Sequence, residues 1–160
     1  MTPDLLDTPL DYNSVAEAGS QFGAAAVIVI DDRACMVQLA LRSTQFYMHE
    51  SCGKCTPCRE GTRWMVQILE KIERGDGEMS DLALLESING RILGKVLCAL
   101  GEFAVYPVSS YIAKWRDEFV AHIQQGRCPY GGNSSLEGIL APSDQHHHAV
   151  VEKPLPSVTA

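Results

Sequence analysis

Four cysteines of this 160-residue chain have the spacing of an iron–sulfur ligand set. Cys52, Cys55 and Cys58 follow one another at a strict C-x2-C-x2-C spacing, and Cys98 lies further along the chain. A cubane cluster takes four thiolates, and three close cysteines plus one remote cysteine is a standard way of supplying them. We therefore expect a [4Fe-4S] cluster with Cys52, Cys55, Cys58 and Cys98 as its metal ligands and cofactor-binding residues.

Two other uses of these cysteines stay open beside the cluster. Zinc usually takes its ligands as two separate pairs, whereas one stretch here supplies three cysteines, so a zinc site would use His49 as the remaining ligand. Cys52 and Cys55 also have the C-x-x-C form of a redox-active dithiol, which normally begins a helix after a strand. The preceding sequence has a helical pattern instead, and Cys58 has no function in a dithiol. We favour the cluster, with a structural zinc-binding interaction domain as the alternative.

Composition and charge exclude several classes of protein. The formal net charge of -7 argues against a nucleic-acid backbone as partner, and a hydrophobic content of 46% is enough for a packed core. The amino terminus lacks the basic region of a signal peptide, and the longest aliphatic run, Ala24 to Ile30, is too short to cross a bilayer. Six cysteines in such a chain indicate a reducing compartment and metal binding. We expect a cytoplasmic protein or a peripheral subunit of a membrane complex.

Hydrophobic periodicity predicts a mainly α fold that positions the cysteines. Apolar residues recur at helical spacing in four segments, and Trp64, Trp115 and Phe119 are expected in the core that these segments form. Four amphipathic helices joined by short loops predict a four-helix bundle with the cluster held at one end. The expected helices cover residues 34–48, 56–75, 80–94 and 107–125, with Thr56-Pro57, Ser80-Asp81 and Pro107 as their start signals.

The two ends of the chain differ from this central part. A short helix over 15–20 is followed by a predicted buried strand, Ala24 to Ile30, which would need partner strands from elsewhere. After Gln125 the sequence is rich in turn residues and then loses any period, so residues 126–160 are predicted to be a mostly disordered tail. Cys128 is interpreted as a spare thiol, and the run His146 to His148 as incidental. The iron–sulfur bundle itself is assigned to residues 32–125.

The cysteine block resembles a known family. Residues 50–61, which hold Cys52, Cys55 and Cys58, and residues 98–101, which begin with Cys98, are similar to the carboxy-terminal part of the NADH-binding flavoprotein subunit of respiratory complex I. NAD-linked hydrogenases and formate dehydrogenases share this part. The resemblance extends from about Leu6 to His122. It implies that the four cysteines hold the cluster that takes electrons from FMN and passes them towards quinone, and that residues 1–31 are the end of a ubiquitin-like domain.

The chain also departs from that family. The family binds FMN and NADH in a preceding glycine-rich α/β domain, and the spacing of Gly19 and Gly23 is not a dinucleotide fingerprint. We therefore expect a truncated subunit, with FMN and NADH bound only on a missing amino-terminal domain, no catalytic residue, and no NADH turnover by this chain alone. The implied partners are a flavin- and NADH-binding domain or subunit and other iron–sulfur subunits, on the cytoplasmic side of the inner membrane, without nucleic acid and without direct membrane insertion.

Overall fold

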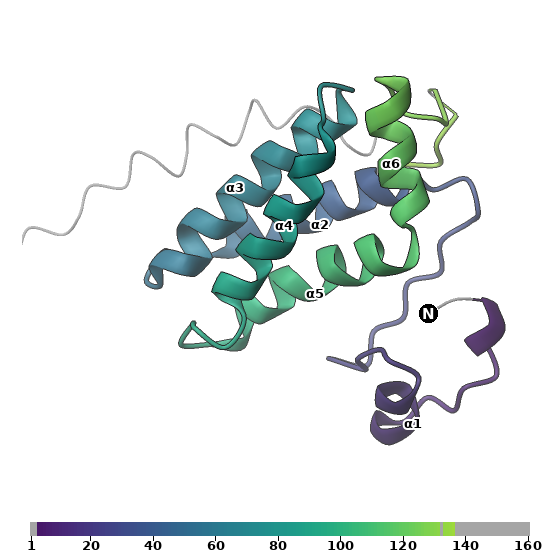
Figure 1. Ribbon diagram of the computed structural model, residues 1–160. Helices are drawn as coiled ribbons and strands as arrows, with labels where there is room; N and C mark the ends of the chain where they lie inside the picture. The colour runs from purple at the N-terminus through teal and green to yellow at the C-terminus, as the bar shows by residue number, and fades with distance from the viewer. Residues whose placement is uncertain (1–2, 132, 137–160) are drawn as a thin grey trace, which may run out of the picture. The chain divides into compact units, whose positions relative to one another are not determined.

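The computed structural model describes residues 3–131 and 133–136 (Figure 1). This part of the chain contains six α-helices, a short 3-10 helix at Pro3–Leu5 and no strand, so the predicted mainly α fold class is confirmed. The chain divides into two compact units, Met1–Asp31 and Asp32–Ala160, and we describe each by itself. Among the described residues, no helix combines the length and the apolar character that a membrane span needs.

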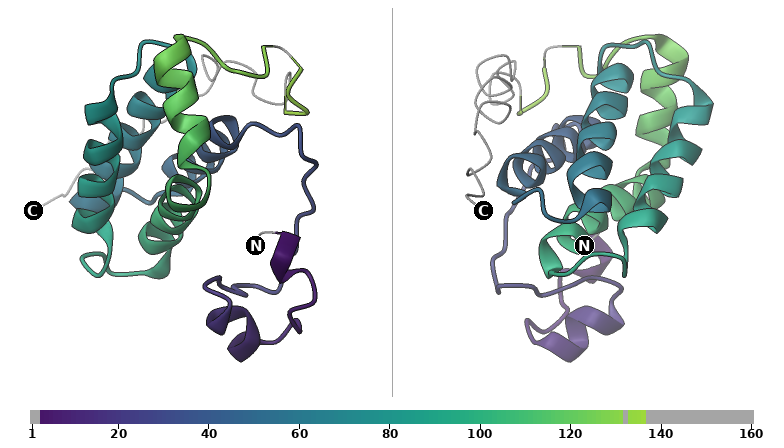
Figure 2. Two further views of the ribbon diagram at one scale, coloured as in Figure 1. Left: turned by 45° about the vertical axis from the view of Figure 1, so that its right-hand side comes forward. Right: turned by 90° about the vertical axis from the view of Figure 1, so that its left-hand side faces the viewer.

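The second unit holds five of the helices around one core (Figure 2). Helix α2 packs against α3 and α5, and α4 packs against the same two helices, while α6 contacts α2, α3 and α5. Fully buried side chains from each helix meet inside this arrangement, among them Val37, Met65, Leu85, Ile112 and Phe119. The helices are α2 (Met36–Glu50), α3 (Thr56–Glu73), α4 (Met79–Ile92), α5 (Ala99–Lys114) and α6 (Arg116–Gln125).

Helix α3 illustrates how the sequence produces this packing. It begins next to Pro57, whose fixed φ and missing N–H suit the first turn of a helix. Met65, Leu69 and Ile72 recur at three- and four-residue intervals and are fully buried. Gly61 faces α4 so closely that a Cβ atom there would lie 2.6 Å from the Ile92 Cδ1 atom. The absence of a side chain at this glycine therefore permits the close approach of α3 and α4.

The predicted fourth helix, 107–125, ends correctly at Gln125, but its start at Pro107 and its continuity are wrong. Helix α5 begins at Ala99, continues through Pro107 and ends at Lys114. A proline inside a helix removes one hydrogen bond and usually kinks or ends it, but buried Val105, Val108 and Ile112 keep the apolar stripe continuous across this position. The chain breaks at Trp115 instead, where φ is -128° and ψ is 37°, and α6 follows.

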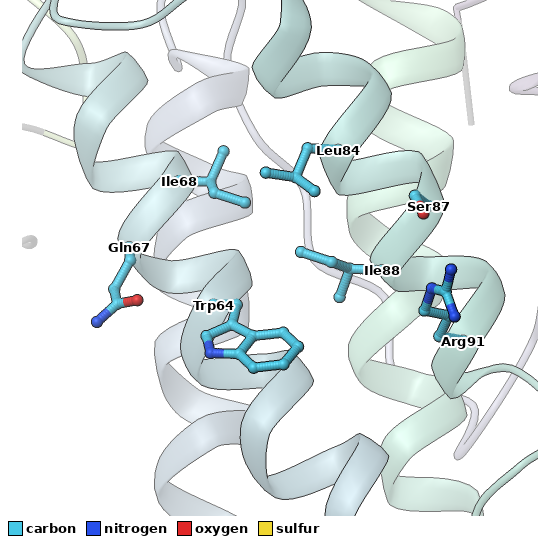
Figure 3. A pocket seen from close by; sticks show the side chains of 7 residues that line it. All are labelled: Trp64, Gln67, Ile68, Leu84, Ser87, Ile88 and Arg91. Atoms are coloured by element: carbon cyan, nitrogen blue, oxygen red, sulfur yellow. The ribbon is translucent and has the colours of Figure 1, made fainter.

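Two further details of the prediction are corrected. Helix α4 is capped by Glu78, which forms a reciprocal capping box with Asp81, and not by Ser80. Trp64 is 51% exposed, whereas Phe119 is fully buried and Trp115 is half-buried. Trp64 lies one position before the buried stripe of α3, about 100° around the helix from Met65. Figure 3 shows Trp64 beside a depression between α3 and α4. This depression has a volume of about 330 Å³, and Leu84 and Arg91 also line it.

The first unit contains the short helix α1 (Tyr12–Glu17) and, after it, a segment without regular secondary structure. Asp11 caps the helix, because its carboxylate accepts hydrogen bonds from the Asn13 and Ser14 N–H groups. The strand predicted at Ala24 to Ile30 is wrong: these residues form no strand, and Val29 is 93% exposed. A strand requires a partner for its backbone groups, and the described residues provide none. The ubiquitin-like origin of this unit remains a prediction.

The chain after α6 returns to the start of α2. The Ser134 hydroxyl is buried and accepts a hydrogen bond from the Cys35 N–H over 3.3 Å. Cys128, Tyr130 and Leu136 pack against the core at the same place. Residues 137–160, and with them the run His146 to His148, lie outside the described part of the chain.

Candidate metal centre

All four predicted cysteines line a single cavity of about 120 Å³. Cys52 belongs to the loop that follows α2, Cys55 and Cys58 lie at the start of α3, and Cys98 precedes α5. The structure thus brings the remote cysteine to the cysteine loop. The cavity is completed by Glu50, Ser51, Val96, Leu100 and Gly101.

Two helices begin at this cavity. Cys55 is the N-cap of α3, and Cys98 is the N-cap of α5. Neither side chain forms a capping hydrogen bond, so the first N–H groups of both helices remain available to a ligand. Because the positive end of a helix dipole stabilises negative charge, two helix starts favour thiolates and an anionic cluster at this position.

Hydrogen-bond donors also surround the sulfur atoms, and the sequence pattern did not predict these donors. The Leu97 N–H donates to the Cys55 Sγ atom over 3.4 Å, and the Ser51 hydroxyl lies 3.3 Å from the Cys58 Sγ atom. The Ser51 hydroxyl also accepts from the Gly53 N–H over 3.3 Å. Hydrogen bonds to ligand sulfur are one of the means by which a protein tunes an iron–sulfur cluster.

The cysteine loop depends on a glycine and an arginine. Gly53 has φ of 75°, a left-handed conformation that residues with a side chain rarely adopt. The Arg59 guanidinium donates to the Gly53 carbonyl oxygen over 2.6 Å and so connects this turn to the first turn of α3. The loop between Cys52 and Cys55 is therefore held in one conformation by the helix that follows it.

The histidine of the zinc alternative does not contribute to the cavity. The His49 Nδ1 atom lies 2.9 Å from a carboxylate oxygen of Glu50, and His49 is absent from the residues that line the cavity. The cavity is therefore lined by four thiols, with free N–H groups at two helix starts and hydrogen-bond donors beside the sulfur atoms. This all-sulfur set suits an iron–sulfur cluster.

The sequence pattern did not indicate a second group of metal-ligating side chains that the structure contains. One ligand atom from each of Cys35, Glu73, His122 and Cys128 lies within 4.8 Å of every other in this group. The one available signal was that two of the six cysteines, Cys35 and Cys128, have no place in the C-x2-C-x2-C…C set.

A comparison with protein families matches residues 38–122 to the NADH-ubiquinone oxidoreductase-F iron-sulfur binding region. Among curated proteins, the F subunit of NADH-quinone oxidoreductase of Mycobacterium tuberculosis is 48% identical over 136 residues, which are 85% of this chain and 31% of that protein. The corresponding F subunit of Streptomyces coelicolor is 50% identical over 129 residues, 81% of this chain and 29% of that protein.

A mitochondrial relative is more distant. The 51 kDa subunit of NADH-ubiquinone oxidoreductase of Aspergillus niger is 35% identical over 132 residues, 82% of this chain and 27% of that protein. The chain thus spans less than a third of the length of these relatives. The matched residues 38–122 include the cysteine loop, Cys98 and the helices that place them around the cavity. The chain therefore belongs to the family of the NADH-ubiquinone oxidoreductase-F iron-sulfur binding region.

Proposed function

We propose that the chain is an electron-transfer module of an NADH:quinone oxidoreductase, in which Cys52, Cys55, Cys58 and Cys98 hold a [4Fe-4S] cluster. The observation that carries the proposal is the single cavity that these four cysteines line, although Cys98 is distant from the others in sequence. When bound, such a cluster accepts and releases one electron at a time.

The residues of the chain have distinct functions in this proposal. The four thiolates bind iron, and the free N–H groups at the starts of α3 and α5 offset the negative charge of the site. The Leu97 N–H and the Ser51 hydroxyl tune the reduction potential through Cys55 and Cys58. Cys58 is buried whereas Cys52 and Cys98 are exposed, so electrons enter and leave on the side of Cys52 and Cys98.

The relatives are named as subunits of NADH-quinone oxidoreductase, and the rest of the proposal follows from that name. FMN and NADH bind outside this chain, on the flavoprotein part of the complex, and the chain relays electrons from FMN towards quinone through other iron–sulfur subunits. In this assembly the chain is peripheral, on the cytoplasmic side of the inner membrane.

Metal and sulfide analysis tests the cluster. The full chain, purified without oxygen, is expected to contain about four irons and about four acid-labile sulfides. Reduction by dithionite should then produce the low-temperature EPR signal of a reduced cubane. Zinc in place of iron at the four cysteines would contradict the proposal. The absence of that EPR signal in iron-loaded protein would contradict it too.

The separation of the flavin from the cluster has its own test. NADH gives up a hydride to a two-electron acceptor such as flavin, whereas a cluster takes single electrons. The cluster-loaded chain should therefore be reduced by dithionite but not by NADH, and a flavoprotein partner that carries FMN should restore reduction by NADH. Rapid bleaching of the cluster absorbance by NADH in the flavin-free chain would show that this division of functions is wrong.

A further inference from the structure

The second group of metal-ligating side chains lies far from the cysteine cavity. Cys35 precedes the first residue of α2 and Cys52 follows its last turn, and Glu73 and Cys58 lie at the two ends of α3. Since α2 has 15 residues, the two places are separated by about 22 Å at about 1.5 Å per residue. Cys35 and Cys128 also lie outside the residues matched by the family, 38–122. The second group is therefore not a part of the first centre.

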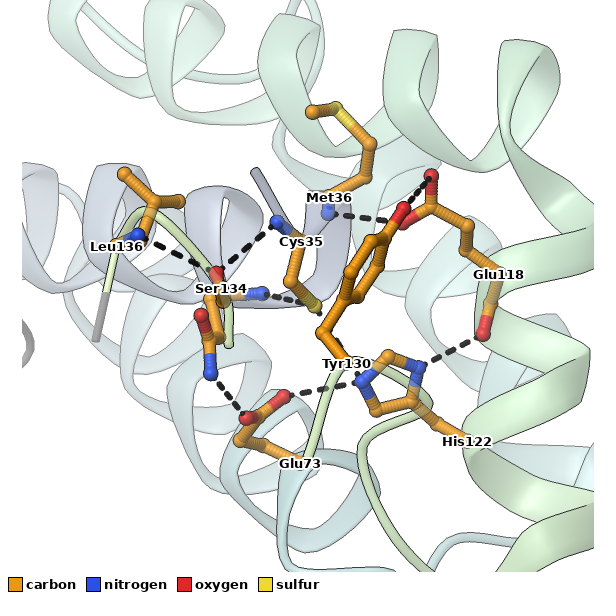
Figure 4. A network of polar contacts seen from close by, with 9 residues as sticks. Cys35, Met36, Glu73, Glu118, His122, Tyr130, Ser134 and Leu136 are labelled. Carbon is orange, nitrogen blue, oxygen red and sulfur yellow. Dashed lines mark hydrogen bonds and ion pairs between the residues drawn. The ribbon is translucent and has the colours of Figure 1, made fainter. Parts of the chain in front are cut away.

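His122 presents a lone pair to this group. Its Nδ1 atom lies 2.8 Å from the Glu118 carbonyl oxygen and must donate to it, because a carbonyl can only accept. In the neutral imidazole, Nε2 is then unprotonated. That atom lies 3.4 Å from the Cys35 Sγ atom and 3.3 Å from the Glu73 Oε2 atom (Figure 4). In metal-binding histidines, the ring nitrogen that does not contact the metal typically donates a hydrogen bond to a carbonyl or a carboxylate.

Glu73 presents an unsatisfied oxygen to the same place. Its Oε1 atom accepts a hydrogen bond from the Gln38 amide over 2.8 Å. Its Oε2 atom is buried and accepts no hydrogen bond among the described residues; the His122 Nε2 atom lies 3.3 Å from it, which is an ion pair only if the imidazole is protonated. With His122 in the neutral form described above, this buried oxygen faces a nitrogen lone pair and not a donor, which is costly. A cation between Glu73 and His122 would satisfy both atoms.

The distances within the group agree with a small tetrahedral site. Zinc lies about 2.0–2.3 Å from its sulfur, nitrogen and oxygen ligands, so neighbouring ligand atoms around it are about 3.3–3.8 Å apart. The two separations from His122 Nε2, 3.4 Å to Cys35 and 3.3 Å to Glu73, have this length. All four ligand atoms lie within 4.8 Å of one another, so small side-chain rotations bring the remaining pairs to the same length.

We propose that Cys35, Glu73, His122 and Cys128 bind one Zn²⁺ ion. The set offers two sulfurs, one imidazole nitrogen and one carboxylate oxygen, all of which are zinc ligands. Cys35 and His122 are fully buried, and four protein ligands leave no open position for water or substrate. The site is therefore structural, and it is independent of the iron–sulfur function proposed above.

The ion would connect segments that already meet through several polar contacts. Cys35 begins α2, Glu73 ends α3, His122 lies on α6, and Cys128 follows α6. The Met36 N–H at the start of α2 donates to a Glu118 carboxylate oxygen on α6 over 3.0 Å, and the Tyr130 hydroxyl donates to Glu118 over 3.4 Å. Zinc at this point would hold the segment from Cys128 to Leu136 on the start of α2.

Burial has a further consequence for Cys35. It raises the pKa of this thiol well above its usual range, so the sulfur is neutral at physiological pH without a nearby cation. A bound divalent cation reverses this effect, because a coordinating thiol is deprotonated.

Co²⁺ and Zn²⁺ serve as the probes in a full-length variant in which Cys52, Cys55, Cys58 and Cys98 are all serine, so that the first centre cannot bind them. Its helical circular dichroism is first compared with that of the parent chain. We expect one equivalent of Co²⁺ to give the visible d–d absorption of a tetrahedral site and a near-ultraviolet thiolate-to-cobalt band. One equivalent of Zn²⁺ should then displace the cobalt.

Single substitutions in this background identify the ligands. Cys128→Ser should weaken metal binding at least tenfold and reduce the thiolate-to-cobalt band by about half, since one of two sulfurs is lost. His122→Gln should have a comparable effect on affinity. His49→Gln is the matched control, because it removes an exposed histidine at the other end of α2 and should leave binding unchanged.

The parent chain provides a measurement that does not depend on the fourfold variant. Purified without chelators, it should contain about one zinc in addition to its iron, and Cys128→Ser should lose the zinc and keep the iron. The absence of cobalt uptake by a folded variant would overturn the proposal, as would binding that is insensitive to both Cys128→Ser and His122→Gln. A metal-free chain with a Cys35–Cys128 disulfide would overturn it too, by showing a redox pair instead.

Discussion

The two cysteine-bearing ends of α2 and α3 differ in ligand chemistry and in exposure. At one end four thiols line a cavity, and two of them, Cys52 and Cys98, are exposed. At the other end two thiols combine with an imidazole and a carboxylate, and Cys35 and His122 have no exposed surface. A centre that exchanges electrons with a partner needs access from outside. A centre that only connects segments is better closed.

The two ends also differ in how the backbone assembles them. Three of the four thiols at the cavity come from one short loop, and the starts of α3 and α5 surround them with N–H groups. The mixed group takes one ligand from each of four places in the chain: Cys35, Glu73, His122 and Cys128. Local sequence therefore determines the first centre, whereas the second depends on the packing of α6 and the segment after it.

The largest expected effect separates the two centres by their metals. Cys98→Ser should reduce the iron content from about four per chain to nearly zero, because the loop supplies just three thiolates. Cys128→Ser, at the other end of the bundle, should leave the iron unchanged. Iron and acid-labile sulfide analysis of both variants checks this. Normal cluster content in Cys98→Ser would show that another residue is the fourth ligand.

The next largest effect should fall only on the end of the molecule that holds the group around His122. A Cβ atom at Gly75 would lie 2.0 Å from the Gly126 carbonyl oxygen, and Gly75 also has φ of 88°. Gly75→Ala should therefore destabilise the fold by about 2–4 kcal/mol in chemical denaturation and weaken zinc binding, since it separates the end of α3 from the end of α6. Iron binding in the folded variant should remain.

Gly94→Ala is the matched control for that substitution. Gly94 has φ of 69° but no atom within 4 Å of the added Cβ position. It should lose only about 1–2 kcal/mol, the cost of the left-handed conformation. Equal losses in the two variants would show that the contact between the two helix ends contributes nothing.

These expectations bear on what the sequence can predict. The meeting of Cys98 with the cysteine loop could be predicted because cluster chemistry requires a fourth sulfur and because the spacing of the other three is specific. The start of α3 was also predictable, since Pro57 favours the first helical turn. The group around His122 could not be predicted, because its four ligands have no common spacing and meet through tertiary packing.

Some errors concern helix boundaries and the choice of buried face. A proline is favoured in the first turn of a helix, so Pro107 was interpreted as a helix start. The apolar stripe through Val105 and Val108 instead continues the helix across it. The size of Trp64 favours a place in the core, although the position beside it, Met65, is the one on the buried stripe. In both cases packing outweighed the local preference of a single residue.

A smaller effect is expected at the four-cysteine cavity. Arg59→Ala removes a hydrogen bond to the Gly53 carbonyl, so the cysteine loop should lose its cluster faster to an iron chelator. A charge-assisted hydrogen bond contributes about 1.5–3 kcal/mol, and we expect about 1 kcal/mol, or about fivefold in rate, because the arginine is exposed. Lys54→Ala, which also removes an exposed positive charge from the loop, should change the rate less than twofold.

The smallest effect should leave both ends unchanged. Arg116 on α6 lies 3.0 Å from Glu86 on α4, and both side chains are about half exposed. Exposed ion pairs contribute about 0–1 kcal/mol, so Arg116→Ala should lower the free energy of unfolding by less than about 0.5 kcal/mol. Iron and zinc contents should stay at the parent values. A larger loss would mean that this ion pair, and not the core, holds α6 in place.

The apolar segment without secondary structure in the first unit, Ala24 to Ile30, has a consequence for the solution behaviour of the chain. From Ala24 to Ile30 the sequence is uncharged and apolar, and Ile28 and Val29 are 82% and 93% exposed. Unpaired backbone in such a segment can form intermolecular β-pairs, which lead to aggregation. Charged residues that interrupt such segments in other proteins act as gatekeepers, and here the nearest charges, Asp31 and Asp32, follow the run. The isolated chain should therefore self-associate through this segment as its concentration rises.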